Sequence, residues 1–453
     1  MTGNRKLAPN EQSMEILNRC ASSFNVVTIS RITGDLKEEI VTKALDLIQS
    51  RHPRLNSRIV GDLDNLSFEF GSKKIPLRVI QKLSFEQWQE VALEELNKPI
   101  ESDKCLARAV LITFPEGQIN YLLTILHHAI SDGLSTVQLH SEILTYCQKI
   151  VDGEIKENIP SLHPLPDIQE LMSKSMQGKI ATVKGILFLL RFKLKISLYR
   201  PETLKFEKYL PTESRRCNMV QRRLNTEITA KLLEFCRQEK TTIQGSLCAA
   251  MMIAAARKIK SEPSAKIRLS CRSYVDLRKR LKPEVNRENL GILASSITSF
   301  HTLDTNTSFW DLARDVRQQL EVSLESEDIF NVVLMFKKIC ESLLSRPNEA
   351  PVTVGITNIG KIDIPSDYGL FKLEEISFVP AQAAFGGVFG AAVTTFQGTM
   401  ILNFMFSEPS LSKETIEILA DDAISFIVDN CNYSELQTNI KSQSYDQFSA
   451  VER

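Results

Sequence analysis

The chain has 453 residues, of which 43% are hydrophobic and 24% charged, and it is too long for one ordinary hydrophobic core. Its 55 Lys and Arg residues are balanced by 55 Asp and Glu residues, so the formal net charge is zero. These values argue against wholesale disorder and against nucleic acid as the main partner. They predict two or three domains, or two large lobes of one enzyme.

The cysteines and the N-terminus indicate the compartment. Nine cysteines are scattered along the chain without a CxxC pair, which is typical of thiols in a reducing environment. Residues 1–14 lack the apolar segment of a secretory signal, and no run of 18 apolar residues is present. We therefore expect a cytoplasmic protein without a membrane span.

The first third of the chain alternates strand-like and helix-like segments. Residues 24–32 are rich in β-branched side chains, which predicts a strand. A helix is expected next, because Asp35 and Glu38 have capping-box spacing, apolar residues then recur on one face, and Pro53 ends the pattern. A second helix is expected over residues 84–97.

Two further strands and a helix follow. Residues 105–114 and 119–128 predict strands, and Pro115-Glu116-Gly117 between them predicts the turn of a hairpin. Apolar residues at helical spacing over 134–151 predict a half-buried helix. The polar segment 152–166 contains three prolines and is expected to end the first lobe.

The segment 174–208 is both basic and apolar, with nine Lys or Arg residues against two acids. One interpretation is a long helix between the lobes, whose Lys and Arg stems cover apolar surface. A second interpretation is contact with a lipid surface, an acidic carrier protein or a long acyl chain. Phe188, Leu189, Leu190 and Phe192 would supply the apolar face.

The rest of the sequence predicts a second set of strands and helices. Strands are expected over residues 219–224, 267–275 and 352–357, and a hairpin over 391–406 with its turn at Gln397-Gly398. Helices are expected over residues 226–238, 242–260, 307–323 and 411–428. The predicted architecture is α/β or α+β, with an N-terminal lobe at 1–165, a linker at 166–210 and a C-terminal lobe at 211–453.

The most specific feature is the motif HHxxxDG at residues 127–133. A neutral imidazole, with an ordinary pKa near 6.5, can take the proton of a hydroxyl or amine that attacks a carbonyl. Because side chains alternate along a strand, only one of His127 and His128 can face a given cavity. Asp132 could cap the next helix or pair with a distant cation, and Gly133 permits a close turn. Taken singly, these residues would fit a buried strand end, a helix cap and a turn; the whole motif favours catalysis.

Other chemistries lack their motifs. Adjacent strand histidines diverge, the remaining four histidines have no ligand-like spacing, and HExxH is absent, so no metal site is expected. GxSxG, the P-loop motif and GxGxxG are also absent, which disfavours a serine hydrolase and nucleotide chemistry.

Through HHxxxDG the chain resembles the condensation-domain superfamily of acyltransferases, which includes chloramphenicol acetyltransferase, condensation domains, plant BAHD enzymes and alcohol acetyltransferases. The likeness is strongest to polyketide-associated acyltransferases of the phthiocerol dimycocerosyl transferase type and to alcohol acetyltransferases. Shorter segments support it in the same order along residues 7–428: RKLAPNE at 5–11, RHPRL at 51–55, VDLR at 275–278, TNIG at 357–360 and TTFQG at 394–398. The DFGWG segment of BAHD enzymes is missing, which disfavours a plant-type enzyme.

The resemblance implies a two-lobe chloramphenicol acetyltransferase-like fold, with mixed sheets flanked by helices and a tunnel between the lobes. In this family pattern His128 matches the general base and Asp132 matches an orienting residue. His127 and Gly133 match supporting positions.

The resemblance also implies contacts from the second lobe. Arg278 matches an arginine that we expect to pair with Asp132, with a surface cation or a contact to donor phosphates as the alternatives. Asn358 and Thr394 match positions that line the tunnel and contact substrate.

The implied activity is transfer of an acyl group from acyl-CoA or an acyl carrier protein to the hydroxyl group of a small molecule, in natural-product or lipid biosynthesis. The thioester is a co-substrate, and no bound cofactor is expected. Amide formation with an amine acceptor and a non-catalytic carrier-binding scaffold are the alternatives. We expect a stand-alone monomer.

Overall fold

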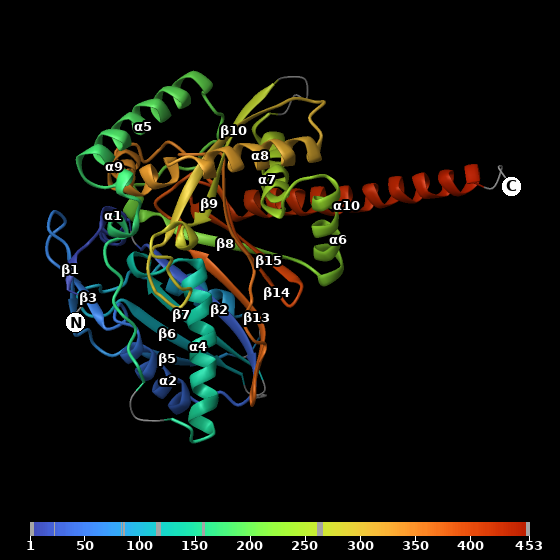
Figure 1. The fold of residues 1–453 in the computed structure, drawn as a ribbon. Coiled ribbons are helices and arrows are strands. Elements are labelled where there is room, and N and C mark those ends of the chain that lie inside the picture. The colour runs from blue at the N-terminus through green and yellow to red at the C-terminus, as the bar shows by residue number, and fades with distance from the viewer. Residues whose placement is uncertain are drawn as a thin grey trace.

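The computed structural model describes residues 4–449 except 22, 83, 85–86, 115–118, 156–158 and 261–265, and side chains as far as residue 432. Two six-stranded sheets form the centre of the molecule, with helices around them and a three-stranded sheet at one edge (Figure 1). This arrangement confirms the expected two-lobe α/β fold with mixed sheets. The small sheet has the order β1 (Arg5–Lys6), β4 (Ser67–Phe70), β3 (Ser57–Val60).

The first large sheet carries the HHxxxDG motif at the end of its central strand. All its neighbouring strands are antiparallel except the outermost pair, β5 and β6. The order is β12 (Asp367–Tyr368), β13 (Phe371–Pro380), β2 (Asn25–Thr33), β7 (Ile119–His127), β6 (Ala107–Thr113), β5 (Leu77–Gln81). The expected hairpin is therefore confirmed as the pair β6–β7, while its turn at Pro115-Glu116-Gly117 lies outside the described residues.

Strand β13 completes this first sheet although it comes from late in the chain. It runs antiparallel to β2, with Ser377 opposite Ile29 and Phe378 opposite Thr28. No strand was expected over residues 371–380. The predicted lobe boundary at residue 211 stays a prediction, and β12 and β13 show that the first sheet draws on both sides of it.

The second large sheet is also mixed. Strand β11 is parallel to both of its neighbours, and the other pairs are antiparallel. The order is β10 (Ala294–Leu303), β9 (Ile267–Asp276), β11 (Val354–Lys361), β14 (Phe389–Phe396), β15 (Thr399–Glu408), β8 (Arg216–Leu224). The predicted hairpin turn is confirmed: Gln397 and Gly398 both have positive φ, as a two-residue hairpin turn requires.

Helices cover the faces of the two sheets and bury their apolar residues. Helices α2 (Glu38–Arg51) and α4 (Gly133–Val151) pack on each other, and α4 packs on the first sheet. Helix α3 (Trp88–Leu96) packs on β2, β7 and β8, so it touches both sheets. Helices α6 (Thr226–Gln238), α7 (Ile243–Ile259), α8 (Phe309–Glu325) and α10 (Lys413–Ser449) pack around the second sheet.

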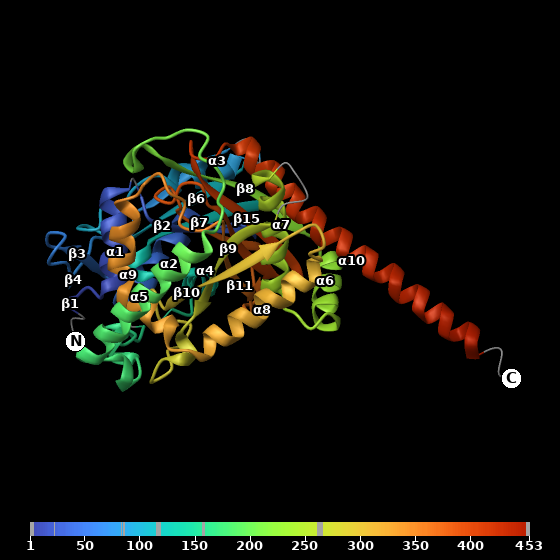
Figure 2. The same ribbon diagram turned by 90° about the horizontal axis from the view of Figure 1, so that it is seen from above.

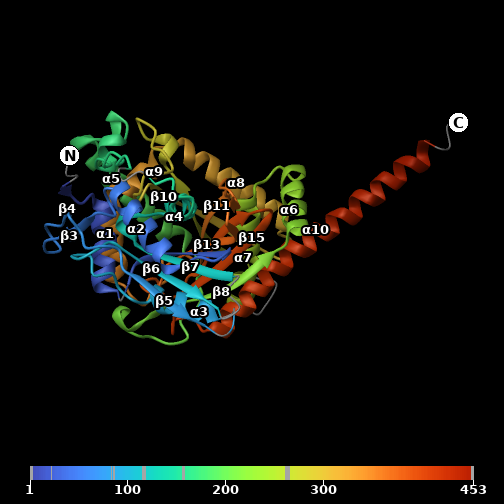
Figure 3. The same cartoon turned by 90° about the horizontal axis from the view of Figure 1, so that it is seen from below.

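Two helices, α1 (Pro9–Cys20) and α9 (Asp328–Leu344), lie where the lobes meet, and a third, α5 (Gly178–Tyr199), lies outside them. Helix α1 packs on α9, and α9 packs in turn on α5. The end of α10 projects away from the body in all three views (Figure 1, Figure 2 and Figure 3). Among the described helices, none is both long enough and apolar enough to cross a membrane.

Hydrogen bonds from side chains also join the two large sheets. The Thr394 hydroxyl of β14 donates to the Ile376 carbonyl of β13 at 3.2 Å. The Asn403 amide of β15 donates to the Phe378 carbonyl at 3.0 Å. Both donors are buried, so these bonds fix how β13 sits against the second sheet.

Several expected element ends were wrong for local reasons. Helix α2 begins at Glu38 with Lys37 as its N-cap, so Asp35 does not cap it. Helix α6, by contrast, spans the expected residues 226–238 and is capped by the Asn225 side chain. Helix α5 is shorter than expected because Arg200 is left-handed, with φ of 52°, and a proline follows it. Helix α9 was not predicted at all, although Ile329, Val333, Phe336 and Cys340 recur at helical spacing.

Candidate active site

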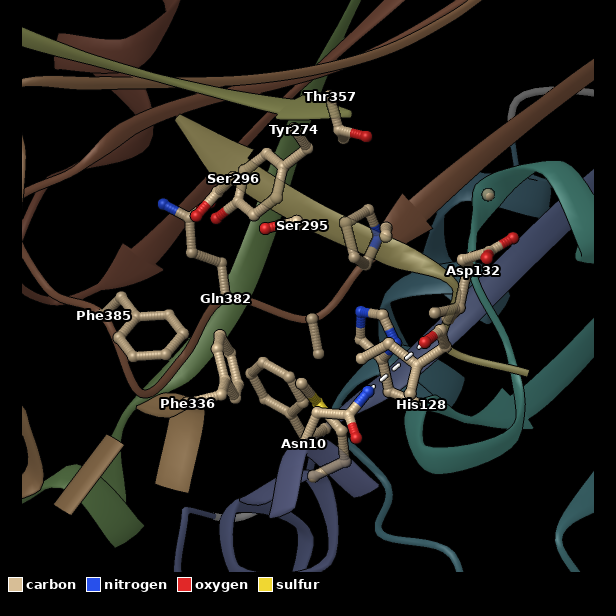
Figure 4. Close-up of a pocket in the computed structure, with 18 of the residues that line it drawn as sticks. Asn10, His128, Asp132, Tyr274, Ser295, Ser296, Phe336, Thr357, Gln382 and Phe385 are labelled. Atoms are coloured by element: carbon tan, nitrogen blue, oxygen red, sulfur yellow. Dashed lines mark hydrogen bonds between the residues drawn. The ribbon is translucent and has the colours of Figure 1, made fainter. Parts of the chain in front are cut away.

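His128 lines a cavity of about 150 Å³ between the two large sheets. The cavity wall combines residues from both sheets with residues of α1 and α9, as Figure 4 shows. Its polar side chains include Asn10, Tyr274, Ser295, Ser296, Thr357 and Gln382. Its apolar side chains include Phe24, Val332, Phe336, Ile339, Phe378 and Phe385.

The His128 ring is held so that one nitrogen remains free to act as a base. Its Nδ1 lies 2.8 Å from the Ser131 carbonyl oxygen. Because a carbonyl can only accept, Nδ1 carries the proton and Nε2 keeps its lone pair. The ring stacks on Phe24 with centroids 5.4 Å apart. Burial lowers the pKa of His128 below its ordinary 6.5, so the imidazole is neutral at neutral pH.

Strand alternation is not what separates the two histidines. Strand β7 ends at His127, and His128 is the first residue of a short 3-10 helix, His128–Ile130. The expectation that residue 128 belongs to the strand was therefore wrong by one residue. The turn of the chain carries His128 to the cavity.

His127 lies inside the first lobe. Its Nδ1 accepts a hydrogen bond from the Ala129 backbone at 3.1 Å, so its proton is on Nε2. That nitrogen lies 2.7 Å from Glu15 Oε2 of α1, and both side chains are fully buried. Burial raises the pKa of Glu15, but contact with His127 outweighs it and the pKa is lowered. This pair fixes the end of β7 against α1.

Asp132 connects the motif to the second lobe. Its Oδ1 accepts from the Ser135 backbone at 3.0 Å and so caps α4. The Arg278 guanidinium donates to Oδ2 at 2.9 Å and to Oδ1 at 3.1 Å, which confirms the expected pairing. The Leu293 backbone adds a bond to Oδ2 at 3.1 Å. Burial alone would raise the pKa of Asp132, but the Arg278 charge lowers it.

The three residues expected to contact substrate lie outside the cavity wall. Arg278 is buried and held by Asp132 and Asp276. Asn358 accepts a hydrogen bond from the Gly360 backbone within a turn, and Thr394 bonds to β13. Their predicted contact with substrate stays a prediction, which this geometry does not support.

Asn10 is a polar residue of the cavity that sequence reasoning missed. Its amide nitrogen donates to the Ile292 carbonyl at 3.3 Å, the bond drawn in Figure 4. This leaves its buried Oδ1 without a hydrogen-bond partner in the described part of the chain. A buried amide oxygen without a partner is a place for a ligand donor. Asn10 belongs to the segment RKLAPNE at 5–11 that supports the resemblance, but nothing in that segment marked it as a site residue.

A second missed residue in the wall is Cys340 of α9. Burial raises the pKa of its thiol to about 12, so it stays protonated at neutral pH. Cys340 is therefore a poor nucleophile at neutral pH. In the described residues no cluster of three or more His, Cys, Asp or Glu side chains is placed to hold a metal ion.

Two family models match the chain, one in each lobe. Residues 13–167 match the Condensation domain, and residues 213–403 match the phthiocerol/phthiodiolone dimycocerosyl transferase C-terminus. Together these matches span most of the chain and confirm the resemblance to the condensation-domain acyltransferases.

Two curated proteins are similar over most of the chain. "Probable alcohol acetyltransferase FCK4" of Fusarium pseudograminearum is 22% identical over 76% of this chain and 73% of its own length. Cyclosporin synthetase simA of Tolypocladium inflatum is 23% identical over 89% of this chain, which spans 2% of that synthetase.

Solved structures share the fold at low identity. TRI3 trichothecene 15-O-acetyltransferase from Fusarium sporotrichioides has a TM-score of 0.74 at 12% identity, over 94% of this chain and 95% of its own. Polyketide synthase associated protein 5 from Mycobacterium tuberculosis has a TM-score of 0.66 at 17% identity, over 93% of this chain and 97% of its own. With the family models, these matches bear out the expected class of enzyme, an acyltransferase.

Proposed function

We propose that this chain, whose two lobes match condensation-domain and dimycocerosyl transferase models, transfers an acyl group from a thioester to a hydroxyl group. The acyl donor is acyl-CoA or an acyl carrier protein, and the product is an ester. The observation that carries the proposal is the free Nε2 of a neutral, partly buried His128 at the cavity between the lobes.

The proposed acyl transfer proceeds through one tetrahedral intermediate, with His128 carrying the proton. The acceptor oxygen attacks the thioester carbonyl carbon while His128 Nε2 takes the hydroxyl proton. The C–S bond breaks as the tetrahedral intermediate collapses, and the proton passes from His128 to the departing sulfur. The products are an ester and a free thiol, and no oxidant, reductant or metal is needed.

The other motif residues act through His128. Asp132 is a positioning residue, because its bonds to Arg278 and to the Leu293 backbone hold the loop that follows β7. His127 is a supporting residue, because it anchors the strand end to Glu15. Gly133 supports the site by leaving room for Phe378 in the cavity wall.

Relatives support an oxygen acceptor. One structural neighbour is named an O-acetyltransferase and one curated relative an alcohol acetyltransferase. The match to a peptide synthetase keeps amine acceptors as the second hypothesis. Asn10 Oδ1 is suited to accept a hydrogen bond from either kind of substrate.

The test is a product assay with a panel of acyl thioesters and alcohols or amines, read by mass spectrometry. His128→Ala should lower turnover by about 10²–10⁴-fold, the usual loss when a general base is removed. His163→Ala is the matched control, because His163 is exposed and lies outside the cavity wall. Unchanged turnover in His128→Ala contradicts the mechanism, an amide product identifies the second hypothesis, and thiol release without an acylated product indicates hydrolysis.

A further inference from the structure

Helix α5 exposes much more apolar surface than is usual for a helix that packs its apolar face on a hydrophobic core. Only Ala181 and Gly185 of its 22 residues are buried. Seven large apolar side chains are between 41% and 70% exposed: Ile180, Val183, Ile186, Leu187, Leu190, Leu194 and Leu198. A contiguous apolar surface of this kind indicates an interaction site.

These seven side chains lie on one side of the helix, which we call the outer face. At 3.6 residues per turn they occupy an arc of roughly 120°. Ala181 and Gly185 lie on the opposite side, against α9. A Cβ on Gly185 would come within 2.6 Å of Met335, so small residues let α5 lie close to α9. In Figure 1 and Figure 2 α5 lies on the outside of the molecule beside α9.

Cations flank the outer face on both sides. Lys184, Arg191 and Lys195 border one edge and Lys193 borders the other, while Lys179 lies in the first turn just inside that second edge. Helix α5 has no Asp or Glu. Of these five cations only Lys184 has an acidic partner among the described residues, Glu327 at 2.6 Å, and Lys195 lies over the Phe300 ring. An apolar stripe flanked by cations, most of them without an acidic partner, is the pattern of a helix that lies in the interface of an anionic bilayer.

A second cavity, of about 200 Å³, lies beneath α5. Phe188 and Phe192 of α5 form its roof, together with Phe300 of β10. It shares Arg272, Ser296, Val332, Phe336 and Ile339 with the wall of the His128 cavity. The two cavities are therefore adjacent and have these five residues in common.

We propose that α5 rests on an anionic lipid bilayer and that the cavity beneath it admits the apolar chain of a membrane-borne substrate to His128. The passage of the substrate chain to His128 rests on the proposed acyl transfer, whereas membrane binding by α5 does not. Phe336 and Arg272 line both cavities, so an entering chain would pass these two side chains on its way to His128.

A bilayer fits the outer face better than a second copy of the chain. Two copies joined by this face in a symmetric pair would bring two rows of unpaired cations together. An anionic bilayer offers apolar depth for the leucines and negative charge for the lysines at once.

The test uses the full chain and flotation with phosphatidylcholine vesicles that contain or lack phosphatidylserine. We expect at least tenfold stronger binding to the vesicles that contain phosphatidylserine, weakened by salt. Leu190→Glu with Leu194→Glu should abolish this preference by placing acids in the stripe. Leu370→Glu is the matched control, because Leu370 is 64% exposed in the turn between β12 and β13 and should not affect binding.

Two activity measurements separate the parts of the proposal. With an acceptor dissolved in the vesicles, the double variant should lose at least tenfold in rate, while a short soluble acceptor should be acylated as in the unchanged chain. If neither assay shows acyl transfer, the proposed function is refuted, but vesicle binding still tests whether α5 rests on a bilayer. Full activity of the double variant on the vesicle-borne acceptor overturns the passage beneath α5.

Several results of the binding measurements would contradict the proposed membrane surface. Equal binding with and without phosphatidylserine, or full binding by the double variant, overturns the membrane surface. Light scattering that finds a dimer, converted to a monomer by the double variant, shows that a second copy covers the outer face. Vesicle-independent binding of an acidic acyl carrier protein that the double variant loses shows that the carrier covers it.

Discussion

The Asp132 carboxylate and the Arg278 guanidinium form a buried pair of hydrogen bonds at 2.9 and 3.1 Å across 146 residues of sequence. One partner begins α4 after the HHxxxDG loop, and the other follows β9 of the second sheet. The pair therefore connects the loop that carries His128 to the opposite wall of the cavity.

Breaking this pair should lower the stability of the protein as well as the rate of the reaction. Arg278→Met leaves the buried Asp132 carboxylate without its cation, which costs about 3–5 kcal/mol. Asp132→Asn should cost less, because Arg278 keeps its bond to Asp276 at 2.9 Å. Urea unfolding measures the loss, and the double variant should recover part of it. Asp46→Asn is the control, because its bond to Lys74 is exposed and should matter by less than about 1 kcal/mol. Equal effects at the buried and exposed pairs would contradict the assigned role.

The pH dependence of the reaction should report the burial of His128. A general base works only when deprotonated, so activity is lost as pH falls through its pKa. Because burial lowers that pKa, the acid limb of kcat/KM should lie below pH 6.5. Phe24→Leu removes the stacked ring and should move the limb upward by exposing His128 to water. An acid limb above pH 7 in the unchanged chain is the result that the structure does not allow.

Gly133 should tolerate no side chain. A Cβ there would come within 2.7 Å of Phe378 and 3.0 Å of Ile359. Gly133→Ala should push the Phe378 ring into the cavity, costing about 1–3 kcal/mol of stability. We expect kcat/KM to fall about tenfold, a barrier increase of about 1.4 kcal/mol. Adding Phe378→Leu should restore activity in part, and no rescue would mean that Gly133 acts through its backbone alone.

His140 should make folding sensitive to acid. The ring is buried between the hydroxyls of Ser30 and Thr124, at 2.7 and 2.6 Å, and burial lowers its pKa to about 3. Below pH 6.5 the unfolded chain binds a proton that the folded chain does not, so the free energy of unfolding falls with pH down to about 3. The slope from this group is up to about 1.4 kcal/mol per pH unit.

Urea unfolding between pH 7 and pH 4 measures that slope. His140→Gln should flatten it while lowering stability at pH 7, since the side chain no longer fits both hydroxyls. His163→Gln is the control, because the His163 side chain is exposed and its replacement should leave the slope unchanged. A slope that is the same in all three proteins would show that other groups control acid unfolding.

Local sequence patterns predicted many of the helices and strands. The β6–β7 hairpin, α4, α7 and the turn at Gln397-Gly398 follow from alternation, helical spacing and turn residues, which act over a few neighbouring positions. Helix α9 and strand β13 were missed, and both help to form the cavity. The exposed stripe of α5 was visible only as a basic, apolar segment.

The sequence by itself determined the HHxxxDG motif, the resemblance it carries and the alternation of strands and helices. Only the tertiary structure decided that Arg278 serves Asp132, that Asn358 and Thr394 lie outside the cavity wall, and that Asn10 and Cys340 lie in it. The physical reason is the distance along the sequence over which each effect acts. Backbone preferences and periodicity act between near neighbours, whereas the wall of the cavity is set by packing between α1, α9 and two sheets whose residues lie far apart along the chain.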